Sequence, residues 1–360
     1  MNCYVTATGS FLPGLPVANE EIADYIGELD GEEETRTKIL RMNGIRFRHY
    51  ALDTRQNPTF TLYQLGAEAA MDCLKKGTDP EKITYLSAGS TNAPLTAPGL
   101  STLLHDRIAS ATQLRQAVEV NSNSGICSAS AQALVNAVRA IHSGEHAEAL
   151  SIGVEQPSEI LKSSVIKPPD DRSLHKDLKR TKWFMSVFLR SMLSDGAGAM
   201  RLSNQANTKG LSFKVDWTYS RSFANEAPLC MHLDSKTRLL SQDINILSKN
   251  LKPFTRKVIS EALEKFNEQF TSYQYILPHL SSFFFKPYLI RAMKEFCKGS
   301  MVDYWTNLAS VGNTGAASIY IMLDEFVKTK VLRNGDKVLL FIPESGQFNF
   351  VLISLTAVQN

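Results

Sequence analysis

Residues 116–155 read QAVEVNSNSGICSASAQALVNAVRAIHSGEHAEALSIGVE, and this stretch decides the class of fold. A short apolar segment is followed by small and polar residues, after which apolar residues recur at helical spacing. That spacing predicts a helix that begins near Ser128 and ends at Gly144. A second apolar segment closes the stretch and predicts another strand. We therefore expect a β–α–β unit whose two strands are parallel neighbours, at the centre of the fold and buried on both faces.

Strand and helix patterns alternate along the rest of the chain, which predicts an α/β protein. Near residue 205 the order of elements begins again, and this indicates an internal duplication with halves at residues 1–205 and 206–360. Asn19 is the expected N-cap of the first helix. The expected strands lie at 3–13, 83–91, 193–203, 210–220, 273–279, 333–346 and 348–358, and the expected helices at 19–29, 62–77, 100–108, 255–270, 287–296 and 314–329.

Composition excludes several classes of protein. The chain has 360 residues, of which 43% are hydrophobic and 21% charged, as expected of a soluble globular protein. A net charge of +3 gives no indication of nucleic-acid binding. We find neither an apolar run long enough for a membrane span nor a signal-peptide pattern. The five cysteines are widely spread, and His142 and His146 lack a third ligand, so we expect a cytoplasmic protein without disulfides or metal.

Cys127 stands at the turn between the strand and the helix of the opening stretch. Unpaired N–H groups and the positive end of the helix dipole favour an anion at that place. We therefore expect a lowered pKa for the thiol, and its small neighbours leave room for a bulky acyl group. The alternative is a small buried residue without a chemical role, which is common for cysteine.

Two further short stretches supply polar residues at similar places. YILPHL puts His279 directly after an expected buried strand, and SVGNTG puts Asn313 between two glycines just before an apolar helix. In an open α/β sheet, ligands bind where parallel strands end. Either residue alone is most simply a satisfied polar group, but together with Cys127 they predict an active site.

Six stretches of the chain, taken in order, resemble one known family. They are GSFLP near the start, RMNGIRFRHYA at 41–51, SGICSASAQAL at 124–134, LSDGAGAM at 193–200, ILPHL at 276–280 and SVGNTGAAS at 310–318. Over nearly its whole length the chain resembles the β-ketoacyl-acyl-carrier-protein synthase III group of thiolase-like condensing enzymes. This resemblance implies a thiolase-like α/β fold, with two duplicated βαβαβαββ halves forming a five-layered αβαβα core.

The resemblance also implies a mechanism. Cys127 would take an acyl group as a thioester, while His279 and Asn313 would donate hydrogen bonds to the thioester carbonyl of a second substrate and stabilise its enolate. The backbone N–H groups of Cys127 and Gly346 would form a second oxyanion hole. The family implies a homodimer and no cofactor beyond the phosphopantetheine of an acyl carrier protein or of coenzyme A.

Several positions depart from the family pattern. Thr37 stands where a Trp, four residues before Arg41, stacks on the adenine of coenzyme A in typical members, and Phe284 stands where an Arg helps to bind the carrier protein. Glu344 and Ser345 replace glycines of the closing loop. These changes favour a specialised member, in polyketide or specialised lipid biosynthesis, and cyclohexanedione formation on the route to dialkylresorcinols is one specific possibility.

Residues 157–185 are polar and charged and predict an insertion or lid. We interpret this segment either as a solvated surface loop or as a docking patch for an acidic carrier protein. Arg41, Lys286 and Arg291 are further candidates for binding the carrier or its pantetheine arm. The basic residues of the segment are Lys162, Lys167, Arg172, Lys176, Lys179, Arg180 and Lys182, against Asp170, Asp171 and Asp177.

Three other functions stay open from the sequence. A papain-like cysteine protease also has Cys, His and Asn in this order, but the residues around Cys127 do not match that family. An acyltransferase of the same fold would make an ester or amide without a C–C bond, and retention of His279 and Asn313 favours condensation over it. A non-catalytic partner subunit would not need the Cys.

Overall fold

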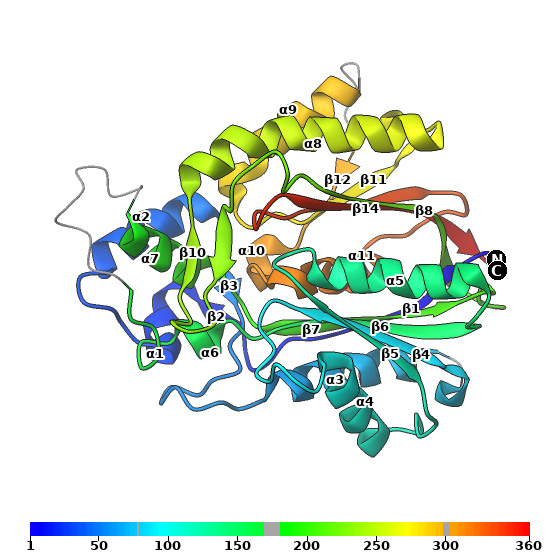
Figure 1. Ribbon diagram of the computed structural model, residues 1–360, viewed down its shortest axis with the longest axis horizontal. Helices are drawn as coiled ribbons and strands as arrows, with labels where there is room; N and C mark the ends of the chain where they lie inside the picture. Colours follow the sequence, from blue (N-terminus) through cyan, green and yellow to red (C-terminus); the bar gives the residue numbers. More distant parts are fainter. Residues whose placement is uncertain (78, 169–180, 298–302) are drawn as a thin grey trace.

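A computed structural model describes residues 1–77, 79–168, 181–297 and 303–360. Within these ranges the dominant feature is one sheet of ten strands (Figure 1). The first half contributes β1 (Tyr4–Phe11), β4 (Tyr85–Ser90), β5 (Glu119–Ser124), β6 (Glu148–Glu155) and β7 (Gly196–Ser203). The second half contributes β8 (Leu211–Ser222), β11 (Tyr275–Pro278), β12 (Asp303–Tyr304), β13 (Lys337–Pro343) and β14 (Asn349–Gln359).

The two halves of the sheet repeat one topology. Numbered by chain order within each half, the strands lie in the order third, second, fourth, fifth, first: β5-β4-β6-β7-β1 and β12-β11-β13-β14-β8. In both halves the second, third and fourth strands are parallel, and the fifth is antiparallel to its neighbours. The first strands, β1 and β8, pair antiparallel and join the halves. The expected division at residues 205 and 206 falls between β7 and β8, and that the halves are separate domains stays a prediction.

Helices cover both sheet halves and fill the space between them (Figure 1). One outer layer is α3 (Leu62–Lys75) and α4 (Leu100–Ala111), and the other is α8 (Ile244–Phe266) and α9 (Lys286–Phe296). The central layer is α5 (Ala129–Ser143) and α11 (Ser318–Thr329), which lie between the two halves of the sheet. This is the five-layered αβαβα arrangement, so the prediction of a thiolase-like fold is confirmed.

The central helix α5 is apolar nearly all round because it is covered by sheet on both sides. Its residues Leu134, Val135, Val138 and Ile141 are each at most 1% exposed. The helix also approaches β4 so closely that a Cβ at Gly89 would lie 2.4 Å from the backbone nitrogen of Ser130. This packing fixes the start of α5, and with it the turn that carries Cys127.

One expectation about the opening stretch is wrong. β5 and β6 are parallel, but they are not neighbours, because β4 lies between them and pairs with both. β5 is an edge strand of the described sheet, and it extends through the polar residues 121–124. Its side chains are exposed or half-buried, whereas those of β4 are fully buried. Polar residues are tolerated there because water satisfies the outer edge of the strand.

Several local expectations also need correction. Residues 19–29 form a 3₁₀ turn (Asn19–Glu21) and a short helix, α1 (Ile22–Ile26). Asn19 is the first residue of the turn and not an N-cap, and its side chain instead accepts a hydrogen bond from Arg48 at 2.8 Å. α8 begins at Ile244 and not near 255. A charged helix that the sequence pattern did not indicate, α2 (Glu33–Asn43), packs on α7 (Lys182–Met192). The remaining elements are α6 (Ser158–Leu161), α10 (Leu308–Val311) and two strand pairs, β2 (Val17–Ala18) with β3 (Phe47–Arg48) and β9 (Met231–Leu233) with β10 (Leu240–Gln242).

The expected insertion at 157–185 is partly an ordered element of the fold. Residues 158–161 form α6, and Lys162, which is only 8% exposed, pairs with Glu159 at 3.1 Å and donates to the carbonyl of Gln56. Residues 158–162 are therefore not a solvated loop, whereas Ser164, Val165 and Lys167 are exposed, as that interpretation expects. The expected basic positions Arg172, Lys176, Lys179 and Arg180 lie outside the described residues.

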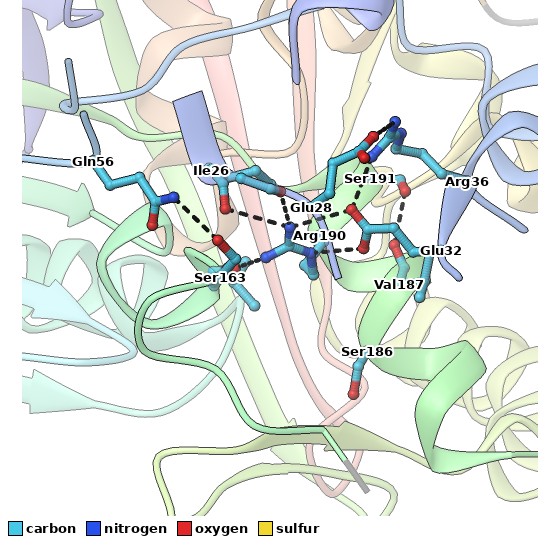
Figure 2. A network of polar contacts seen from close by, with 12 residues as sticks. Ile26, Glu28, Glu32, Arg36, Gln56, Ser163, Ser186, Val187, Arg190 and Ser191 are labelled. Carbon is cyan, nitrogen blue, oxygen red and sulfur yellow. Dashed lines mark hydrogen bonds and ion pairs between the residues drawn. The ribbon is translucent and has the colours of Figure 1, made fainter. Parts of the chain in front are cut away.

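A buried ion pair ties α2 to α7 (Figure 2). Arg190 on α7 donates to both carboxylate oxygens of Glu32, at 3.1 and 3.3 Å, and both side chains are 2% exposed. The other guanidinium N–H groups donate to the carbonyls of Leu161, Ile26 and Gly27. Arg36 adds a second contact to Glu32 at 2.8 Å. Because every charge in this network has a partner, removing one member leaves another buried and unpaired.

We predict that Glu32→Ala destabilises the fold strongly. Breaking a buried pair by removing one partner costs about 3–5 kcal/mol, because the remaining Arg190 charge stays desolvated. Urea unfolding followed by circular dichroism measures the loss. Glu34→Gln is the matched control, since its pair with Lys38 is exposed and we expect an unchanged unfolding midpoint. Equal midpoints for the two variants would contradict the role given to the network.

Candidate active site

Cys127 lies in the turn between β5 and α5, where the sequence places it. β5 ends at Ser124, α5 begins at Ala129, and Ser128 is the N-cap residue. The thiol is buried, with the residue 9% exposed. It lines two adjoining cavities, so what enters either of them meets the sulfur.

The two cavities both reach the thiol and extend from it in different directions. The first has a volume of about 70 Å³ and extends toward α8 and α9, and the second, of about 50 Å³, extends toward β6 and α6. His279 lines the first and Asn313 the second. The structure therefore brings the three predicted site residues together. Both cavities also share Gln242, Ser281 and Ser345 with Cys127.

His279 stands directly after β11, and its backbone N–H donates to the carbonyl of Phe341 at 2.8 Å. The side chain is 3% exposed, and neither ring nitrogen has a hydrogen-bond partner among the described residues. Burial lowers the pKa of His279 to about 4. At neutral pH the imidazole is uncharged, and its N–H is available to donate to a substrate.

Asn313 is held by its backbone and by one side-chain bond. Its N–H donates to the carbonyl of Met192, and its own carbonyl accepts from Ser194. The side-chain oxygen accepts from the N–H of Gly315 at 3.0 Å, which leaves the amide N–H groups available as donors in a residue that lines the second cavity. Gly312 and Gly315 flank it at φ of +77° and +52°, a conformation that side chains disfavour, and this explains the sequence GNTG.

The expected lowering of the pKa of the Cys127 thiol is wrong. Burial raises that pKa, and the nearby carboxyl groups of Glu344 and Glu155 raise it further. A hydrogen bond from its own backbone N–H acts in the opposite direction. The helix N-terminus is present as expected, but removal of water and two acidic neighbours outweigh its effect.

Glu344 occupies the helix N-terminus that the sequence pattern assigned to a thiolate. Its Oε2 accepts hydrogen bonds from the N–H, at 3.2 Å, and the hydroxyl of Ser128. Its Oε1 accepts from Asn349 at 3.0 Å. The next turn brings Gly346 against the same loop, where a Cβ would lie 3.0 Å from Ile126. The use of the Gly346 N–H in an oxyanion hole stays a prediction.

Glu155, the last residue of β6, was missed by the sequence reasoning. It is 5% exposed and lines the second cavity beside Cys127 and Asn313. Burial raises its pKa to about 7, although three hydrogen bonds from Thr91 and Ala316 act to lower it. The available signal was a carboxylate at the end of a buried strand, the edge at which ligands bind.

The aromatic run after His279 forms the wall of a third, larger cavity. This cavity has a volume of about 550 Å³ and lies between α2 and α7, with Phe284 and Phe285 among its lining residues. Phe284 is 40% exposed. Phe285 lines both this cavity and the first one, so the two spaces lie on either side of one residue.

The expected carrier-binding residues are not part of the cavity around Cys127. Arg41 is exposed on α2, as is Thr37. Lys286 and Arg291 lie on α9, the first half-buried beside Phe283 and Tyr304 and the second exposed. They are therefore surface residues, and their role in binding a carrier stays a prediction.

Comparison with known proteins agrees with this geometry. Residues 274–343 match the family model described as 3-Oxoacyl-[acyl-carrier-protein (ACP)] synthase III C terminal. The tetronic acid condensing enzyme AbyA1 has a TM-score of 0.79 at 18% identity, with 98% of this chain and 99% of that chain covered. The 3-oxoacyl-[acyl-carrier-protein] synthase III from Aquifex aeolicus has a TM-score of 0.74 at 21% identity, with 98% of this chain and 99% of that chain covered. Xanthomonas campestris OleA with bound lauric acid and lauroyl-CoA has a TM-score of 0.74 at 16% identity, with 99% of each chain covered.

Residues 274–343 are therefore similar to the C-terminal part of a 3-oxoacyl-[acyl-carrier-protein] synthase III. At these identities the solved structures show the fold alone, and the chain shares that fold over nearly its whole length. The papain-like alternative is wrong, because this fold around Cys127, His279 and Asn313 is that of the condensing enzymes and not that of a papain-like protease. Within the described ranges, none of the chain's helices combines the length and apolarity that crossing a membrane requires.

We predict that Glu344→Gln makes the thiol of Cys127 more reactive. The carboxylate raises the pKa of Cys127, so neutralising it lowers that pKa and increases the thiolate fraction at any pH below it. We expect alkylation of Cys127 by iodoacetamide at pH 8 to become about tenfold faster, the effect of a one-unit shift. Gln retains an acceptor for Ser128. An unchanged rate would show that burial alone sets the pKa, and Cys127→Ala gives the background.

Proposed function

We propose that this protein is an acyl-thioester condensing enzyme that forms a C–C bond by Claisen-type condensation through an acyl-Cys127 intermediate. The observation that carries the proposal is that uncharged His279 and the amide of Asn313, each with N–H groups to donate, line the two cavities that share the Cys127 thiol. Donors arranged in this way match the negative charge that develops on a thioester oxygen.

In the first step the sulfur of Cys127 attacks an acyl thioester. A bond forms between the acyl carbon and the sulfur of Cys127, and the bond between that carbon and the sulfur of the acyl donor breaks. The proton of the Cys127 thiol passes to the departing sulfur. Cys suits this role because it is both a good nucleophile and a good leaving group. Its raised pKa keeps the resting thiol protonated, so deprotonation accompanies substrate binding.

In the second step His279 and Asn313 donate hydrogen bonds to the thioester carbonyl of the other substrate. Loss of an α-proton to a base, or of an α-carboxyl group as carbon dioxide, leaves an electron pair that forms the enolate. The enolate carbon attacks the acyl-Cys127 carbonyl, the new C–C bond forms, the C–S bond to Cys127 breaks and the sulfur takes up a proton. An uncharged imidazole is suited to this role because it has an N–H to donate and does not have to lose a proton. Burial of His279 and Asn313 strengthens both hydrogen bonds.

The acyl groups would arrive on the phosphopantetheine of an acyl carrier protein or of coenzyme A. We propose the large cavity beside Phe285 as the path of this arm. The similarity to a tetronic acid condensing enzyme, and to the priming ketosynthase of the R1128 polyketide pathway, supports a role in polyketide or specialised lipid biosynthesis. Cyclohexanedione formation is a specific form of this proposal.

Homodimer formation stays a prediction. β5 lies at the edge of the described sheet and would be available to pair with a second copy of the chain.

We predict that Cys127 carries the acyl group and that His279 acts afterwards. Mass spectrometry after exposure to an acyl-carrier protein should show an adduct on Cys127 that is lost in Cys127→Ala. His279→Ala should accept the acyl group at the normal rate and form about 100-fold less condensed product. An adduct that survives Cys127→Ala would remove the nucleophile, and an ester or amide product without a new C–C bond would favour the acyltransferase alternative.

We propose that Lys286 and Arg291, with the exposed Lys167 and Lys182, dock the acidic carrier protein. Lys162 is excluded because it is buried and paired with Glu159. Reversing the charge of both α9 residues should slow acylation from the carrier about tenfold and leave acylation from a small thioester unchanged. The control is Lys209→Glu, an exposed charge between β7 and β8. Equal slowing with both donors would contradict the docking surface.

A further inference from the structure

Three carboxyl groups are buried close to the active-site cavity: Glu155, Asp195 and Glu344. Each is at most 5% exposed. Both oxygens of Glu344 accept hydrogen bonds, from Ser128 and Asn349. Both oxygens of Asp195 also accept, from Ser158 and the backbone of Ala51. Neither residue lines a cavity around Cys127, so neither can contact a substrate there. Their hydrogen bonds give both of them a structural role.

Glu155 differs from these two in both respects. Its Oε1 accepts from the N–H of Thr91 at 2.8 Å, from the Thr91 hydroxyl at 2.6 Å and from the N–H of Ala316 at 3.4 Å. Its Oε2 has no hydrogen-bond partner among the described residues, and the side chain lines the second cavity with Cys127 and Asn313. One oxygen is therefore held in place by three donors while the other is available to a substrate.

The position of Glu155 is set by the loop that also carries Asn313. A Cβ at Gly315 would lie 3.1 Å from Cγ of Glu155, so glycine at that place allows the loop to close over the carboxylate. The N–H of Ala316 from the same loop holds Oε1. Glu155, Asn313 and Cys127 consequently line one small space of about 50 Å³.

The electrostatic environment suits a proton acceptor. Burial is the main cause that raises the pKa of Glu155 to about 7, and Asp195 adds to it, so the carboxylate is substantially populated at neutral pH. Of the other groups that face the cavity, the Cys127 thiol stays protonated and His279 is a weak base, since burial lowers its pKa to about 4. Catalytic bases work best with a pKa near the operating pH.

We propose that Glu155 is the catalytic base that removes a proton from the carbon next to the thioester carbonyl, so that the enzyme joins two simple acyl thioesters without a carboxylated extender. This inference rests on the condensing function proposed above and names its substrate class. It assigns Glu155 a contact with the reacting carbon, while His279 and Asn313 hold the oxygen of the same group.

The step is balanced without any other reagent. The Glu155 carboxylate takes the proton, and the C–H electron pair forms the enolate, whose oxygen accepts hydrogen bonds from His279 and Asn313. The enolate carbon attacks the acyl-Cys127 carbonyl, the new C–C bond forms and the C–S bond to Cys127 breaks. The proton on Glu155 then returns to the sulfur, which restores both the carboxylate and the thiol. No carbon dioxide is released.

Glu155→Gln tests the proposal because Gln keeps an acceptor for Thr91 and Ala316 but is not a base. The probes are butyryl-CoA alone and butyryl-CoA with malonyl-CoA, in D₂O. We expect the natural protein to exchange the α-hydrogens of butyryl-CoA for deuterium and to condense two butyryl groups. In the variant both activities should fall at least about 100-fold, with normal butyrylation of Cys127. Exchange by the natural protein should rise with pH and level off above about 7, because the carboxylate is the active form.

The second pair of probes separates chemistry from positioning. Loss of carbon dioxide from malonyl-CoA supplies the enolate without a base, so the variant should condense butyryl-Cys127 with malonyl-CoA within about threefold of the natural rate. Equal loss on both routes would show that Glu155 only supports the Asn313 loop and would overturn the proposal. Normal exchange in the variant, or no exchange in the natural protein while the malonyl route proceeds, would overturn it too.

Failure of the underlying function gives a different result. Absence of any butyryl adduct on Cys127 in the natural protein would overturn the condensing function and this inference together. Glu159→Gln is the matched control, since this carboxyl group lies four residues farther along the chain and pairs with Lys162. We expect it to exchange and condense as the natural protein does.

Discussion

Exclusion of water from the turn around Cys127 is the constraint on which the chemistry of this protein depends. The same desolvation keeps the thiol protonated, keeps His279 uncharged and brings the pKa of Glu155 close to neutrality. In such a site an unpaired charge is costly, so the thiol and the imidazole stay uncharged, and hydrogen bonds from Thr91 and Ala316 stabilise the carboxylate of Glu155. Proton transfer between neighbouring groups consequently replaces a preformed thiolate.

The geometry of the site depends on how the two halves of the chain meet. The first half supplies Cys127 and Glu155, and the second supplies His279 and Asn313. Pairing of β1 with β8 makes one sheet of the two, and a parallel bridge between Leu193 and Asn313 ties the Asn loop directly to the first half. The reacting groups are thus positioned by backbone hydrogen bonds and not by long flexible side chains.

Sequence patterns predicted what local periodicity and local chemistry determine. The helix after Cys127, the strand before His279 and the glycines around Asn313 are each specified by a few adjacent residues. Strand neighbours are not specified in this way, which is why β4 between β5 and β6 was not foreseen. The prediction of a lowered pKa for Cys127 was wrong for the same reason. The groups that bury the thiol, and the carboxylate of Glu344, come from distant parts of the chain. Glu155 was missed because one acidic residue at the end of a strand has no distinctive pattern.

The Arg190–Glu32 network bears on how this protein can change over evolutionary time. The network anchors α2 from its inner side, whereas Thr37 and Arg41 are exposed on the same helix. Substitutions on the outer side therefore leave the anchor intact and cost the fold little. The outer side of α2 can therefore vary in sequence while the helix itself is retained, so a surface with new binding properties can arise there with little loss of stability.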